Sequence, residues 1–374
     1  MQRTHTAGDG GTSGAPAIAR GPGWNTNLSQ VVDEWPEPIL EIRNLVTHFA
    51  GAEGTIRAVD DVTLTLERGS TLGIVGESGC GKSVTVRSIL GLLPGQAQIV
   101  GGEILYRGRD ERVVDLASLN PRGPEMRSVR GNEIAMIFQE PMAAFSPVYP
   151  IGRQIVEAVR IHTDKSKRDA RSHVIEMLAR VGVPQPERMV DRFPFELSGG
   201  LLQRAMIAMA LSCRPSILIA DEPTTALDVT VQGQVLTLLA DLQREMEMSV
   251  ILISHNMGVI AQAADVVAVM YMGRVVEQAP VWELFDNPQH PYTRALLESV
   301  PVIETEAELG GRLRAVAGDV PNPYDVPSGC RFHPRCTAFM ANMCERAEPV
   351  LVKVGDEHTA ACFLAEHGHG ERRD

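Results

Sequence analysis

Three continuous apolar runs along the chain each end in small or polar residues. They are TLGIVG (71–76), SILIADE (216–222) and SVILISH (249–255). Short apolar runs of this kind predict strands that are buried on both faces of a parallel sheet. Because ligands of open α/β sheets bind beyond the carboxyl ends of the strands, we expect the three ends to meet at one site.

Other segments predict what surrounds this sheet. Residues 38–50 and 58–70 alternate apolar and polar positions, which predicts antiparallel strands. Helical spacing follows the first buried strand at 82–93, and an amphipathic crossover helix is predicted at 231–246. Residues 140–195 have helical periodicity without a clear strand pattern. An α/β core with a mostly helical insertion is therefore expected.

Composition and charge narrow the class of protein. The chain has 374 residues, enough for one large and one small domain, and a net charge of −12, which disfavours general nucleic-acid binding. Its first 30 residues lack the apolar core of a secretory signal, and we expect them to be a disordered lead-in. No stretch reaches the roughly 18 unbroken apolar residues of a membrane span, so work at a membrane would require another subunit.

The segment GESGCGKS (76–83) fits the P-loop pattern G-x-x-x-x-G-K-[ST] and lies between a predicted strand and a predicted helix. Its glycines allow consecutive backbone N–H groups to surround phosphate oxygens. Lys82 would reach the β and γ phosphates, and the Ser83 hydroxyl would bind Mg²⁺. The candidate nucleotide-binding residues of this loop are Gly76, Glu77, Ser78, Gly79, Cys80, Gly81, Lys82 and Ser83.

Two further motifs complete the predicted chemistry. Asp221 would hold Mg²⁺ and Glu222 would orient the attacking water, although two acids before Pro223 also suit a simple turn cap. The segment LSGG precedes an apolar helical run and would offer a second phosphate-binding surface, although it also suits a plain helix cap. Its candidate residues are Ser198, Gly199 and Gly200.

These motifs, with FQE, ILIADEPTTALD and ISH in this order, resemble an ABC-type ATPase domain over roughly residues 38–285. By this resemblance Gln139 is the glutamine that senses Mg²⁺ and the γ-phosphate, and Asp228 bridges two ATPase domains. His255 is the histidine that contacts the γ-phosphate. Phe49 is the candidate for adenine stacking, although a loop at 50–57 obscures its register. The chain departs from many members at Leu201, Leu202 and Asn256.

The resemblance implies a fold and a domain division. The fold is a P-loop NTPase of ABC type, with a RecA-like core, an antiparallel β subdomain, a helical subdomain and a small cysteine-containing C-terminal domain. The expected parts are a disordered tail at 1–37, the ATPase domain at 38–285 with its helical subdomain at about 140–200, and a C-terminal extension at 286–374.

The same resemblance implies ATP hydrolysis with ATP and Mg²⁺, the metal being held by Ser83, Gln139 and Asp221. In the family, ATP lies between the P-loop of one domain and the LSGG segment of another, so a second ATPase subunit, identical or paralogous, is implied. Two membrane permeases and, indirectly, an extracytoplasmic substrate-binding protein complete the expected assembly, with no nucleic acid. We therefore expect a peripheral protein on the cytoplasmic face of the inner membrane. An exposed apolar strip within 140–155, which includes Met142, Phe145, Pro147 and Tyr149, would receive the permease, although the segment also suits an ordinary Pro-rich packed loop.

The cargo class follows from resemblance alone. The segments 140–155 and NPQHPYTRALLESVP (287–301) resemble importers of oligopeptides and dipeptides. A nickel or opine importer remains an alternative, because the ATPase does not touch cargo. A soluble ABC ATPase acting on ribosomes or DNA is disfavoured, since the chain has neither a second ATPase domain nor a long coiled coil. A redox- or iron-sensing regulator is a third class.

Four of the six cysteines gather near the C-terminus with the spacing C-x₅-C-x₇-C-x₁₇-C. Disulfides are improbable in a chain without a secretion signal, whereas zinc, an iron–sulfur cluster and unpaired thiols all remain open from the spacing. Peptide-importer ATPases with a similar tail hold a [4Fe–4S] cluster, and this resemblance implies the same here, with His333 as a substitute ligand. The implied ligands are Cys330, Cys336, Cys344 and Cys362.

Overall fold

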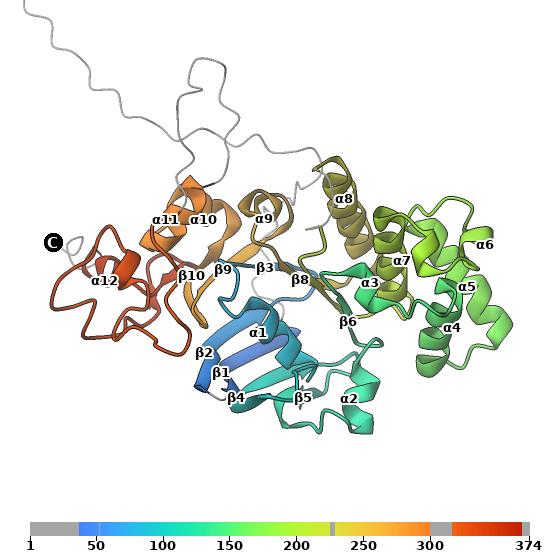
Figure 1. The fold of residues 1–374 in the computed structure, drawn as a ribbon, viewed down its shortest axis with the longest axis horizontal. Helices are drawn as coiled ribbons and strands as arrows, with labels where there is room; N and C mark the ends of the chain where they lie inside the picture. The colour runs from blue at the N-terminus through green and yellow to red at the C-terminus, as the bar shows by residue number, and fades with distance from the viewer. Residues whose placement is uncertain (1–36, 52, 225–228, 300–315, 369–374) are drawn as a thin grey trace, which may run out of the picture. The chain divides into compact units, whose positions relative to one another are not determined.

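The computed structural model describes residues 37–51, 53–224, 229–299 and 316–368, which belong to one compact unit, Glu34–Asp374. Within it lie an eight-stranded sheet of order β11-β12-β10-β9-β3-β8-β7-β6 and a four-stranded sheet of order β2-β1-β4-β5 (Figure 1). No helix of the described ranges is both long and apolar enough to cross a membrane.

The centre of the eight-stranded sheet is parallel, as predicted. β3 (Thr71–Val75), β8 (Ser249–Ile253) and β7 (Ile217–Asp221) are neighbours, and all their residues are buried. β6 (Ile134–Ile137) extends the parallel part beyond β7. In this register Ile253 lies beside both Ile74 and Asp221, so the three carboxyl ends share one edge.

The N-terminal strands form the antiparallel sheet that the alternating pattern predicts. β1 (Leu40–Gly51) pairs with β2 (Gly54–Leu66) and, on its other side, with β4 (Ala97–Arg107), which pairs with β5 (Val113–Asp115). The expected loop at 50–57 is wrong, because β2 already begins at Gly54. The helix α1 (Lys82–Ile89), which follows β3, contacts this sheet, and the hydroxyls of Thr47 and Ser88 lie 3.1 Å apart between them.

The segment between β6 and β7 is helical, as its periodicity predicts. Buried aliphatic side chains such as Ile155, Val159, Val174 and Leu178 place the helical segments 151–162 and 167–180 in the main core. The helices are α3 (Pro141–Ala144), α4 (Ile151–His162), α5 (Lys167–Arg180), α6 (Pro186–Met189) and α7 (Gly199–Leu211). The short α2 (Pro124–Val129) precedes β6, and the predicted crossover helix is α8 (Val229–Met246).

The C-terminal region continues the main sheet. After α9 (Met257–Ala263), the strands β9 (Val266–Tyr271) and β10 (Arg274–Pro280) run antiparallel to each other, and α10 (Val281–Asp286) and α11 (Pro291–Glu298) follow. β12 (Thr359–Ala360) pairs with both β10 and β11 (Val352–Lys353), and α12 (Phe363–Gly368) comes last.

The small separate C-terminal domain that we expected is not confirmed. Glu277 and Gln278 of β10 pair with Ala360 and Thr359 of β12, so the end of the chain extends the main sheet. Phe332 is part of the main apolar core, and Cys330 and Cys336 pack against it. The C-terminal region thus shares a core with the rest of the unit.

Candidate nucleotide-binding site

The loop between β3 and α1 adopts a curled backbone that requires glycine. Gly76, Gly79 and Gly81 have φ values of 148°, 80° and 107°. A Cβ on Gly76 would lie 2.2 Å from the carbonyl oxygen of Met270, and one on Gly81 would lie 2.3 Å from that of Ala58. Any larger residue would clash with backbone at these two positions, so the sequence pattern here has a direct steric cause.

Lys82 is folded back over this loop. Its side chain is buried, and Nζ donates hydrogen bonds to the carbonyl oxygens of Gly76 (2.8 Å) and Glu77 (3.0 Å). The N-cap of α1 is Gly81, and no side chain caps this end of the helix. The amide groups and the helix dipole at this end favour an anion, as does the ammonium group.

Ser83 and Asp221 form the candidate Mg²⁺ site. Ser83 Oγ donates a hydrogen bond of 2.9 Å to Asp221 Oδ1. Asp221 Oδ2 is buried without a hydrogen-bond partner, and its nearest cation is Arg87, at 3.6 Å. Burial raises the pKa of Asp221, and the hydrogen bond from Ser83 partly offsets this. A hydroxyl beside an unsatisfied carboxylate oxygen is a donor set that suits Mg²⁺.

Glu222 is held at the end of β7 between two other predicted residues. Its φ is 51°, a left-handed conformation that is uncommon outside glycine, and its N–H donates to the Ile253 carbonyl at 3.1 Å. Gln139 Nε2 donates to Glu222 Oε2 at 3.2 Å, and His255 Nδ1 lies 3.3 Å from the same oxygen. The structure therefore brings Gln139, Glu222 and His255 together.

The LSGG segment forms the N-terminus of α7. Ser198 is the N-cap, and its Oγ accepts a hydrogen bond from the Leu201 N–H at 3.4 Å. Among the described residues, no hydrogen bond joins Ser198, Gly199 or Gly200 to the loop at Gly76–Ser83. The helix is tied to the site through Gln203, whose Nε2 donates to the Pro223 carbonyl at 2.7 Å.

Two other predicted residues receive no support from the geometry. Phe49 is half-buried in β1 opposite Ile56 and Ala97, and its adenine-stacking role stays a prediction. Asp228 lies outside the described residues.

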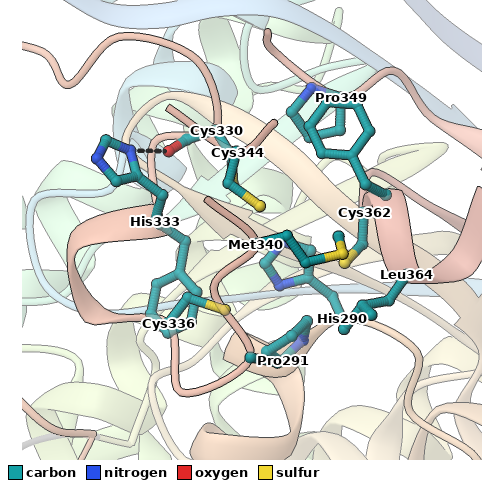
Figure 2. Close-up of a pocket in the computed structure, with 13 residues that line it drawn as sticks. His290, Pro291, Cys330, His333, Cys336, Met340, Cys344, Pro349, Cys362 and Leu364 are labelled. Carbon is teal, nitrogen blue, oxygen red and sulfur yellow. Dashed lines mark hydrogen bonds between the residues drawn. The ribbon is translucent and has the colours of Figure 1, made fainter. Parts of the chain in front are cut away.

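The four C-terminal cysteines line a single small pocket (Figure 2). Burial raises the pKa of Cys330 to about 11 and also raises those of Cys336 and Cys362, with further contributions from neighbouring cysteines in the pocket. In the parts of the chain that the structure describes, no three or more His, Cys, Asp or Glu side chains are placed to hold a metal ion. The ring of His333 is already engaged, since Nδ1 lies 2.9 Å from the Cys330 carbonyl oxygen. The donor chemistry thus suits a soft metal, but the described geometry is not that of a closed metal site.

Sequence reasoning missed three residues around the nucleotide site. Gln203 left a signal, because it is a polar side chain inside an apolar helical run. Arg335 contacts Glu77 of the P-loop through its guanidinium, and Tyr292 Oη accepts a hydrogen bond from the Glu77 N–H. Nothing in the spacing of the chain indicates these two contacts.

Comparisons with known proteins give the family of this chain. Residues 59–225 match the ABC transporter family, and residues 276–344 match the C-terminal region of oligopeptide/dipeptide transporters. A probable peptide ABC transporter ATP-binding protein of Sinorhizobium fredii is 50% identical over 87% of this chain and 94% of its own length. The dipeptide transport ATP-binding protein DppD of Bacillus subtilis is 45% identical over 90% of this chain and 100% of its own.

Solved structures extend the likeness to the fold. A dimeric bacterial ABC transporter cassette superposes with a TM-score of 0.57 at 25% identity, over 65% of this chain and 98% of that one. An ATP-binding cassette dimer bound to ADP and phosphate gives the same TM-score at 24% identity. Together with the relatives at 45–50% identity over most of both chains, these findings confirm the predicted family and core fold. The chain belongs to the ABC transporter family and is an ATP-binding cassette ATPase.

Proposed function

We propose that this ATPase energises an importer of peptides. What carries the ATP-hydrolysing part of the proposal is the meeting of Gln139, Glu222 and His255 beside Ser83 and Asp221 at one sheet edge. In this arrangement Lys82 and the loop N–H groups bind the phosphates of ATP. Ser83, Asp221 and Gln139 hold Mg²⁺, which neutralises phosphate charge when bound. Glu222 orients and polarises the attacking water, while His255 contacts the γ-phosphate.

The peptide cargo is supported by the C-terminal region and by the relatives. The match over 276–344 is to oligopeptide/dipeptide transporters, and the named relatives are peptide and dipeptide transport proteins. A nickel or opine importer stays the alternative, because the ATPase site does not contact the transported cargo.

The proposed assembly is a dimer of ATPase subunits, identical or paralogous, beneath two permeases on the cytoplasmic face of the inner membrane. The strip at 140–155 supports the docking site, since Met142 (51% exposed), Val148 (67%) and Tyr149 (42%) lie open to solvent. Phe145 was expected in this strip, but that expectation is wrong, because its ring is buried in the main core. The boundaries at residues 37 and 285 stay proposed segment boundaries. The extension at 286–374 shares a sheet and a core with the ATPase part, and residues 1–36 of the expected tail lie outside the described residues.

Purification of the native complex tests the proposed assembly and cargo. Two integral membrane subunits and a peptide-binding protein that copurify with this chain, together with peptide-stimulated ATPase activity, are the expected result. A ribosomal partner, or stimulation by nickel but not by peptides, would overturn the peptide-importer assignment while leaving the ATPase itself intact.

We also propose that Cys330, Cys336, Cys344 and Cys362 hold a [4Fe–4S] cluster. The support is a pocket lined by four thiols, a soft donor set, together with the resemblance of this tail to that of peptide-importer ATPases that hold such a cluster. Anaerobic purification with iron and sulfide analysis is expected to give both elements in equal amounts. Cys362→Ser should lower the iron content, whereas Cys213→Ser, which alters a cysteine outside the pocket, should not. Zinc without sulfide, or no metal at all, would refute the cluster.

A further inference from the structure

The segment between the first two pocket cysteines, CRFHPRC (330–336), directs two arginines into the ATPase unit. The Arg331 guanidinium contacts Asp60 of β2 and donates to the Met272 carbonyl at 2.5 Å, and Arg335 reaches Glu77 of the P-loop. We infer that Arg335 and Tyr292 are positioning residues for nucleotide binding, and that both act through Glu77.

The contact between Arg335 and Glu77 is bidentate. Nη1 lies 2.7 Å from one carboxylate oxygen of Glu77 and Nη2 lies 3.0 Å from the other. The Arg335 side chain is only 3% exposed, and its guanidinium lies within 6 Å of the ring centroids of Tyr271 (5.8 Å) and Phe332 (5.9 Å). Its Nε donates to the Ala317 carbonyl at 2.9 Å, so hydrogen bonds from all three guanidinium nitrogens hold the orientation of the planar group. A lysine would keep the charge but lose this two-pronged geometry.

Tyr292 holds the backbone of the same residue. Its Oη accepts a hydrogen bond of 2.9 Å from the Glu77 N–H. The Tyr292 ring is fully buried and lies 4.7 Å from the ring of Tyr271 and 5.3 Å from that of Phe332, measured between centroids. Two segments that lie more than 200 residues downstream therefore fix both the main chain and the side chain of one P-loop residue.

This restraint has an electrostatic consequence for ATP. Glu77 is an acid inside the loop that surrounds the phosphates, and its carbonyl oxygen accepts from Lys82 Nζ at 3.0 Å. Without Arg335, the carboxylate would be unpaired beside a highly charged anion and would repel it. With Arg335, the charge is paired and the loop is held in its curled form, which lowers the cost of ordering it when nucleotide binds. The pair therefore acts on nucleotide affinity more than on the chemical step.

A double-mutant cycle on the full-length protein tests the inference. Arg335→Ala is expected to raise the KM and Kd for Mg-ATP about tenfold while kcat changes less than about threefold. In a Glu77→Gln background, Arg335→Ala should raise the Kd for Mg-ATP by about threefold or less, because no carboxylate charge is left unpaired. Tyr292→Phe keeps the ring and removes the acceptor, and it should raise Kd by roughly threefold.

Two further variants separate positioning from general stability. Arg335→Lys is expected to recover part of the affinity, since it keeps the charge. Arg331→Gln changes the neighbouring arginine, which contacts β2 and Met272 but not the P-loop, and it should lower the melting temperature without shifting Kd. An unchanged Kd in Arg335→Ala, an equal loss with and without Glu77, or an equal shift in Arg331→Gln would each overturn the inference.

Discussion

Ser83 Oγ donates a hydrogen bond of 2.9 Å to Asp221 Oδ1, although the two residues lie 138 positions apart. Ser83 lies in the first turn of α1, which follows β3, and Asp221 ends β7, with β8 between the two strands in the sheet. The parallel register places both at the same edge, so hydroxyl and carboxylate meet where Mg-ATP is expected to bind.

The first prediction concerns Asp221→Asn. The variant keeps the acceptor for Ser83 but removes the charge that Mg²⁺ requires. The rise in melting temperature on addition of Mg-ATP should therefore be almost lost. In the absence of nucleotide the variant should melt at the same or a higher temperature, because the buried carboxylate carries a desolvation penalty. Thermal melts with ATP, with and without Mg²⁺, check both parts. Full Mg-dependent stabilisation in the variant would contradict the assignment of the site.

The second prediction concerns Glu222→Gln. The amide cannot polarise the attacking water, so ATP turnover should fall at least ~100-fold, the scale of a lost general base, while ATP remains bound. Steady-state hydrolysis and retention of labelled ATP measure the two effects. Glu176→Gln is the matched control, because Glu176 is an exposed helical acid in the insertion, and its turnover should equal that of the wild type. Substantial ATPase activity in Glu222→Gln would show that Glu222 is not the general base.

The third prediction concerns Lys82→Ala. Lys82 Nζ is held by the carbonyl oxygens of Gly76 and Glu77, close to where the phosphates are expected. Removal of this cation should weaken ATP binding by about tenfold or more, since a charge-assisted contact contributes ~1.5–3 kcal/mol. Equilibrium titration with a fluorescent ATP analogue measures the change, and Lys165→Ala, on the exposed surface, should bind as the wild type does. Equal affinities in the two variants would exclude the predicted role.

The fourth prediction concerns a buried pair in the C-terminal region. His358 Nε2 lies 2.7 Å from Glu277 Oε1, and both side chains have 0% exposure. Burial alone would lower the pKa of His358, but the contacts with Glu277 and Glu283 raise it above its usual value. Burial alone would raise the pKa of Glu277, but hydrogen bonds from His358 and from the N–H groups of Gln289 and His290 lower it.

The signs of these shifts define a pH window. The contribution of His358 to stability is complete below about pH 6.5 and is lost as pH rises through its raised pKa. The contribution of Glu277 is complete above about pH 4.5 and is lost as pH falls through its lowered pKa. The difference in melting temperature between the wild type and His358→Asn should therefore be largest between about pH 4.5 and 6.5 and should shrink at alkaline pH.

His162→Asn provides the control for this window. Burial lowers the pKa of His162, so its contribution to stability is lost as pH falls and does not change above about pH 6.5. A difference between the wild type and His358→Asn that stays constant from pH 5 to 9 would contradict the charged pair.

Much of the fold could be predicted from the chain alone. The three apolar runs form the strands β3, β7 and β8, and Gly76, Glu222 and His255 lie just beyond the ends of these strands. The glycines of the P-loop have the steric cause that their motif implies. These features are local, because a strand, a tight turn and a helix start each depend on a few consecutive residues. The prediction that Phe145 lies in an exposed strip was wrong for the opposite reason. Only tertiary packing decides which aromatic side chain is buried.

The sequence by itself determined the local motifs: a glycine-rich loop before a helix, two acids and a histidine at the ends of buried strands, and the family that these motifs resemble. Tertiary structure alone decided that Arg335 and Tyr292 reach Glu77 across 258 and 215 positions. It also decided that the cysteine-rich end adds to the main sheet through β12. Such contacts depend on how distant segments pack, and no periodicity or spacing along the chain encodes which buried arginine meets which acid.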